Sequence, residues 1–123
     1  MGTPTTRHPT HYLIPAGYEG WVEIEYGAEG PSLPYRNGIY ICRIPADGVL
    51  VTSSVLEDGW AQDEYFYYGS NGSLKSLPAT DWGKGGMIWA GETGFDQESG
   101  VATPHRLNEK FFVGTESQYR GQR

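Results

Sequence analysis

The sequence predicts an all-β fold, namely a small antiparallel β-sandwich of about seven short strands with one short helical turn near the C-terminus. The composition supports this prediction, because 18 Gly and 8 Pro favour turns while 9 Tyr, 4 Trp and 4 Phe favour strands. The pattern supports it as well, because short runs of alternating apolar and polar residues recur between turn signals.

The chain of 123 residues is long enough for one domain with its own core. We expect residues 1–10, which are polar and contain Pro4 and Pro9, to form a flexible arm. Residues 11–123 then form a single β-sandwich domain, transthyretin-like or immunoglobulin-like in general shape.

The stretch YLIPAGYEGWVEIEY, residues 12–26, predicts the opening hairpin of the fold. Its second half, Gly20–Tyr26, alternates as a strand with one face in water, and Val22 and Ile24 mark the apolar face. The polar face carries three residues: Trp21, Glu23 and Glu25. Trp21 therefore lies near the start of the predicted strand, and its ring is expected on the side away from the core.

A second hairpin is predicted from Ile39–Ile44, which is apolar on both faces as a central strand should be. The turn Pro45–Gly48 would return the chain antiparallel along Val49–Val51. Further strands are predicted at Glu64–Tyr68, before an Asn71-Gly72 turn signal, and at Met87–Ala90 and Lys110–Val113. A capping box, Thr115 to Gln118, predicts the helical turn.

The predicted core consists of apolar residues of these strands: Val22, Ile24, Ile39, Ile41, Leu50, Phe66, Ile88, Phe111 and Val113. Cys42 is the single cysteine, which excludes an intramolecular disulfide and any multi-cysteine metal site. We interpret it as a buried strand residue.

The formal charge of −6, with acidic residues scattered along the chain, provides no basic stripe for phosphates and argues against nucleic-acid binding. The sequence contains no run of about eighteen apolar residues, so no transmembrane segment is predicted. The protein is therefore expected in the cytoplasm as the sequence stands, or outside it if a leader has been removed.

No motif indicates catalysis. We predict no catalytic residues, no cofactor and no metal site, since His8 and His11 supply at most half of a tetrahedral zinc shell. An enzyme is not indicated by the residues, although we leave that question open.

The densest aromatic and acidic run, LEDGWAQDEYFYY, is the predicted contact surface for a ligand or partner. If Phe66 faces the core, alternation places its two Tyr neighbours on the other face. The surface is predicted to consist of six residues, with the loop 91–100 beside them: Trp60, Asp63, Glu64, Tyr65, Tyr67 and Trp82. The alternative is that a second sheet or a partner in a homodimer covers that face.

Several motifs in one order carry a resemblance. YLIPAGYEGWV, IPADGVLVTSS, GWAQDEYFYY and FFVGT span about residues 12–120 and resemble an uncharacterised family of small bacterial domains of unknown function. Members of that family are often small exported or lipid-anchored proteins. The resemblance implies no activity, cofactor or catalytic residue.

The sequence as a whole therefore predicts a non-enzymatic binding or protein-interaction module whose ligand, a protein or a small polar molecule, is unknown. One alternative is an acidic, immunity-type inhibitor of a basic partner protein, which the charge and small size suit. A further alternative is a glycan-binding or glycan-hydrolysing domain, since aromatic faces stack on sugar rings.

Overall fold

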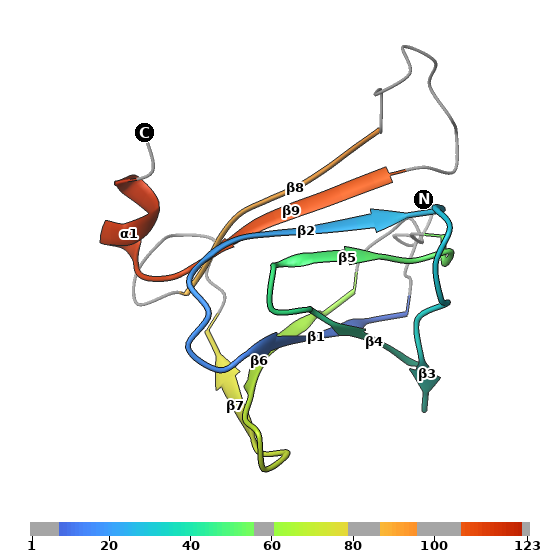
Figure 1. The fold of residues 1–123 in the computed structure, drawn as a ribbon, viewed down its shortest axis with the longest axis horizontal. Coiled ribbons are helices and arrows are strands. Elements are labelled where there is room, and N and C mark those ends of the chain that lie inside the picture. Colours follow the sequence, from blue (N-terminus) through green and yellow to red (C-terminus); the bar gives the residue numbers. More distant parts are fainter. Residues whose placement is uncertain (1–7, 56–60, 79–86, 96–106, 122–123) are drawn as a thin grey trace, which may run out of the picture.

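Two β-sheets face each other in the computed structural model, which describes residues 8–55, 61–78, 87–95 and 107–121 (Figure 1). Sheet 1 has the strand order β3-β4-β1-β6-β7, and sheet 2 has the order β5-β2-β9-β8. The elements of the described chain are β1 (Thr10–Pro15), β2 (Gly20–Tyr26), β3 (Tyr35–Arg36), β4 (Ile39–Arg43), β5 (Val49–Val51), β6 (Glu64–Tyr68), β7 (Leu74–Leu77), β8 (Ile88–Phe95), β9 (Leu107–Val113) and α1 (Glu116–Arg120). The predicted all-β, sandwich-like fold with a short C-terminal helix is confirmed.

Both sheets are mixed, whereas the sequence predicted antiparallel pairing throughout and about seven strands. In sheet 1, β1 is parallel to both β4 and β6. In sheet 2, β2 is parallel to β5 but antiparallel to β9. The reason is the connectivity, because the chain changes sheets after β1, β2, β4, β5 and β7, so neighbours in sequence often lie in opposite sheets.

The opening stretch is not a hairpin. Its turn closes as expected, with the Tyr18 amide donating to the Pro15 carbonyl at 2.9 Å and Gly17 at φ +82°. The turn nevertheless delivers β1 to sheet 1 and β2 to sheet 2, so the two strands face each other across the core.

The second predicted hairpin is wrong in the same way. The turn before β5 closes with the Gly48 amide donating to Pro45 O at 2.9 Å, and Gly48 has φ +81°. However, β4 belongs to sheet 1, while β5 pairs in parallel with β2, Leu50 opposite Ile24. A closed turn reverses the chain, but it does not decide which sheet receives the next strand.

Other local predictions hold. The Asn71-Gly72 signal turns β6 into β7, a strand that the sequence analysis does not predict, and Tyr68 pairs with Leu74 across it. The capping box at α1 is formed, because the Gln118 amide donates to Thr115 Oγ1 and the Thr115 amide donates to Gln118 Oε1.

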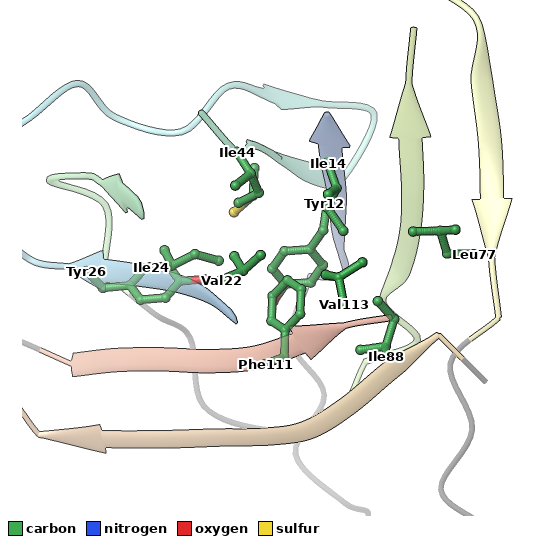
Figure 2. Close-up of a cluster of buried hydrophobic side chains, with 11 residues drawn as sticks. Tyr12, Ile14, Val22, Ile24, Tyr26, Ile44, Leu77, Ile88, Phe111 and Val113 are labelled. Atoms are coloured by element: carbon green, nitrogen blue, oxygen red, sulfur yellow. The ribbon is translucent and has the colours of Figure 1, made fainter. Parts of the chain in front are cut away.

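The core lies between the sheets, and Figure 2 shows side chains from both sheets meeting there. Five predicted core residues are buried: Val22, Ile24, Ile88, Phe111 and Val113. Leu50 is half-buried against this core. Ile39, Ile41 and Phe66 are corrections, because they are only half-buried and alternate with the inward residues of their strands.

A glycine substitution tests the turn between β4 and β5. Replacing Gly48 by Ala should cost more stability than replacing Gly72, although both have φ +81°. A Cβ at Gly48 would stand 2.8 Å from the Trp21 carbonyl oxygen and also meet Tyr18, whereas a Cβ at Gly72 meets nothing within 4 Å. We expect about 1–2 kcal/mol for Gly72→Ala from backbone strain and about 1–3 kcal/mol more for Gly48→Ala. Urea denaturation measures both, and equal losses would contradict the close packing at Gly48.

Candidate functional site

An open hollow of about 380 Å³ lies on the outer face of sheet 2, the face that points away from the core. We call it the Trp21 groove, and its lining consists of Trp21, Val22, Glu23, Gly48, Val49 and Lys110. The Trp21 side chain is 41% exposed and Val49 is 42% exposed, so the groove offers apolar surface to solvent.

The indole of Trp21 is held in place by aromatic side chains of neighbouring elements. Its ring meets Phe112 of β9 edge to face at 5.5 Å and Tyr119 of α1 at 6.2 Å. Tyr119 in turn stacks on Trp89 at 5.7 Å, and the Trp89 indole donates to Gly114 O at 2.9 Å. The exposed face of Trp21 therefore stands on a supported aromatic layer.

The helix α1, which carries Tyr119, is also held by a hydrogen bond to the segment just before β2. Gln118 Nε2 of α1 donates to Glu19 Oε2, just before β2, at 2.7 Å. Together with the capping box, this hydrogen bond positions Tyr119 beside Trp21.

The opposite side of the groove is formed by the turn before β5. The Glu23 amide donates to Gly48 O at 2.8 Å, and the Tyr18 hydroxyl donates to the Trp21 carbonyl. Burial, and then the charge of Asp47, raise the pKa of Tyr18 above its ordinary value. The groove is thus built on a fixed backbone.

Charged side chains follow the Trp21 groove along β2. The Lys110 ammonium lies 4.0 Å from the Glu23 carboxylate, and a second hollow of about 450 Å³ follows. That hollow is lined by Glu25, Gly27, Ala28, Glu29 and Val51. We call Glu23, Glu25 and Glu29 the acidic strip. An aromatic platform followed by carboxylates suits a polar or cationic ligand with an apolar part.

A polar cluster lies between the sheets, where the hydroxyl groups of Tyr12 and Tyr26 both donate to Glu109 Oε1, at 2.7 and 3.1 Å. Burial and the nearby Glu109 charge raise the pKa of both tyrosines. The same causes, burial first, raise the pKa of Cys42 to about 12. Cys42 is a buried free thiol, as predicted, and a thiol with this pKa is a poor nucleophile at neutral pH.

Two tyrosines of the contact surface predicted around Glu64–Tyr68 pack against the core. Tyr65 and Tyr67 face the core, where Tyr65 stacks on Tyr12 at 4.7 Å and the Tyr67 hydroxyl donates to Tyr18 O at 2.7 Å. We expected Phe66 to face the core and its two Tyr neighbours to face away from it. The strand has the opposite orientation, so this expectation is wrong.

The acidic members of that surface bond to β1. Asp63 Oδ1 accepts from the Thr10 amide at 2.8 Å, and Glu64 Oε2 lies 3.0 Å from His11 Nε2. Trp60, Trp82 and residues 96–100 lie outside the described residues, while β8 extends through Phe95 into the predicted loop. The predicted contact surface as a whole stays a prediction.

Sequence reasoning placed Trp21, Glu23 and Glu25 together on the polar face of their strand, but it missed Gly48, Val49 and Lys110 as their neighbours. The pairing of β2 with β5 and β9 brings them there, and no local signal predicts such pairing. Among the described residues, no group of three or more His, Cys, Asp or Glu could hold a metal ion. No helix in the described part of the chain is long and apolar enough to cross a membrane.

Comparison with known families gives a match over residues 6–120 to a family of unknown function, DUF6843. The chain belongs to this family. The match spans nearly all of the chain, as the resemblance of its motifs implied.

Among solved structures, the fold is similar to a crystal structure described as "Putative Lipoprotein from Bacillus anthracis". The TM-score is 0.68 at 23% identity, and the similarity covers 91% of this chain and 73% of the other. At this identity, the similarity concerns the fold alone. Among curated proteins, none matches the chain.

The buried cluster predicts a loss of stability in alkali. Because the pKa values of Tyr12, Tyr26 and Cys42 are raised by folding, the folded protein retains protons that the unfolded chain releases above about pH 8.5–10. Their stabilisation is complete below that range and falls as pH rises through it. Urea denaturation at neutral pH and near pH 10.5 should show this fall, and the fall should be smaller in Tyr26→Phe. An equal fall in wild type and variant would contradict the assignment.

Proposed function

We propose that the protein is a non-enzymatic protein-interaction module that binds its partner through the Trp21 groove. One observation supports this above others: Trp21 is a large aromatic side chain, 41% exposed, that is held rigid by Phe112 and Tyr119 at the edge of a hollow. Exposed tryptophans that need no ordering on contact are typical centres of binding surfaces.

The rest of the groove fits this role. Val49 adds apolar surface beside the indole, while Glu23 and Lys110 place charges of both signs at the rim. An apolar centre with a polar rim is the usual anatomy of a protein interface.

The acidic strip favours a second, narrower candidate, an inhibitor that covers a basic partner. Glu25 and Glu29 line the hollow next to the groove, and the chain carries a net charge of −6. Complementary charge of this kind increases association rates and is weakened by salt. A small acidic protein with one aromatic contact point is consistent with that role.

Selection from a phage-displayed random peptide library tests the proposal. We expect the wild type to enrich peptides that Trp21→Ala binds at least about tenfold more weakly, as for loss of a central aromatic contact. Leu74→Ala is the matched control, because Leu74 is 55% exposed on β7 of the other sheet, and it should bind as the wild type does.

Four other outcomes would each point to a different conclusion. Unchanged binding by Trp21→Ala would contradict the groove. If Trp60→Ala lost binding instead, the contact surface would be the one predicted around Asp63 and Glu64. Enrichment of basic peptides whose binding weakens steeply with salt would favour the inhibitor candidate, whereas binding only on a glycan array would favour the carbohydrate alternative.

A further inference from the structure

The Trp21 groove and the acidic strip follow each other along the outer face of sheet 2, where β5 lies beside β2 (Figure 1). The outward side chains of β2 are Trp21, Glu23 and Glu25, which alternate with its buried residues. In β5, Val49 pairs with Glu23 and Val51 pairs with Glu25. The outer face of these two strands therefore has three successive rows, from the indole at one end to the Glu25 carboxylate at the other.

The rows differ in charge. In the middle row, the Lys110 ammonium lies 4.0 Å from the Glu23 carboxylate, so both signs are present. Lys110 is also the only Lys or Arg in the four strands of sheet 2 that the structure describes. In the last row, no Lys, Arg or His of the described chain forms an ion pair with Glu25 or with Glu29, which is exposed and lines the same hollow. Negative charge is therefore unbalanced at the row farthest from Trp21.

The acidic end of this surface is held in place by backbone hydrogen bonds. The Thr52 amide donates to the Glu25 carbonyl at 2.9 Å, and the Ala28 amide donates to the Thr52 carbonyl at 3.0 Å. The segment that carries Glu29 is thereby held against the segment after β5. A partner consequently has little of this backbone to order when it binds.

We propose that the occupant of these three rows is an extended, basic segment of the protein partner, an inference that rests on the function proposed above. An apolar or aromatic residue of the segment covers Trp21 and Val49. A Lys or Arg four residues away pairs with Glu25 and Glu29. The aromatic groove binds the segment, and the carboxylates beyond it select its charge.

The geometry of the rows sets the spacing within the segment. Trp21 and Glu25 are four residues apart in β2, which corresponds to about 13 Å in an extended strand. Two side chains of an extended partner that are also four residues apart match this separation. The floor beneath them is two strands wide, with about 5 Å between the strand axes, whereas a helix with its side chains is about 10–12 Å across. An extended segment therefore fits this floor better than a helix does.

Charge complementarity favours a basic segment over a neutral or an acidic one. A guanidinium or ammonium group gains charge-assisted hydrogen bonds at Glu25 and Glu29, whereas a carboxylate there is repelled. The side chain between the two contacts faces the pair of Glu23 and Lys110, which suits a neutral polar residue. Since alternate side chains of an extended segment point to one side, the expected pattern is apolar, any, polar, any, basic.

Parallel selections from a phage-displayed random peptide library, read by sequencing, test the inference. Peptides enriched on the wild type should pair an apolar or aromatic residue with a Lys or Arg four positions away. On the double variant Glu25→Gln, Glu29→Gln, the basic preference should disappear while the apolar preference stays. Synthetic peptides from the wild-type selection should bind this variant about fivefold more weakly, as for loss of exposed ion pairs. Circular dichroism checks that each variant is folded.

Two further variants separate local from overall charge. The double variant Leu74→Lys, Ser76→Lys is the matched control, because it shifts the net charge by the same amount at exposed positions of β7 on the other sheet. It should keep the basic preference at the same spacing. The charge reversal Glu25→Lys, Glu29→Lys should instead enrich Asp or Glu at that position, a gain that loss of folding cannot produce.

The outcomes distinguish this inference from the function on which it rests. Peptides that depend on Trp21 but carry no basic residue at the expected spacing would overturn the inference and leave the proposed function standing. Basic residues without a fixed distance to the apolar residue would also overturn it, because overall charge would then explain their enrichment. If no selected peptide depended on Trp21, the proposed function itself would fail, and the inference with it.

Discussion

The carboxylate of Glu109 is the point on which the arrangement of the two sheets depends. It extends inward from β9, opposite Ile24, and a carboxylate in that place must be paired with hydrogen-bond donors. Tyr12 from sheet 1 and Tyr26 from sheet 2 supply them, at 2.7 and 3.1 Å. Since the two hydroxyl groups come from opposite sheets, this single side chain fixes how the sheets sit over one another.

The outer faces follow from this inner arrangement. With Ile24 and Tyr26 directed inward beside Glu109, alternation along β2 turns Trp21 and Glu23 outward, where β5, β9 and α1 surround them. The proposed partner groove is consequently on the outer surface of sheet 2.

The sequence predicts the features that depend on local order. The alternation in β2, the Asn71-Gly72 turn and the Thr115 capping box are local, and each is found. The sheet that receives each strand depends on contacts distant in sequence, so the hairpin expected from Ile39 to Val51 is wrong. The sequence also does not decide which alternate residues of Glu64–Tyr68 face the core, because Tyr and Phe are both large and apolar enough to be buried there. Glu109 was missed since its polar neighbours suggest a loop.

The most direct test of the account is a double-mutant cycle of Tyr12→Phe and Glu109→Leu, measured as free energies of unfolding in urea. Each substitution removes one end of the hydrogen bond that joins the sheets, and Tyr12→Phe keeps the ring stacked against Tyr65. We expect a coupling energy of about 1–3 kcal/mol between the two positions. Strictly additive losses would show that Tyr12 and Glu109 act independently and would contradict the role of Glu109 as the tie between the sheets.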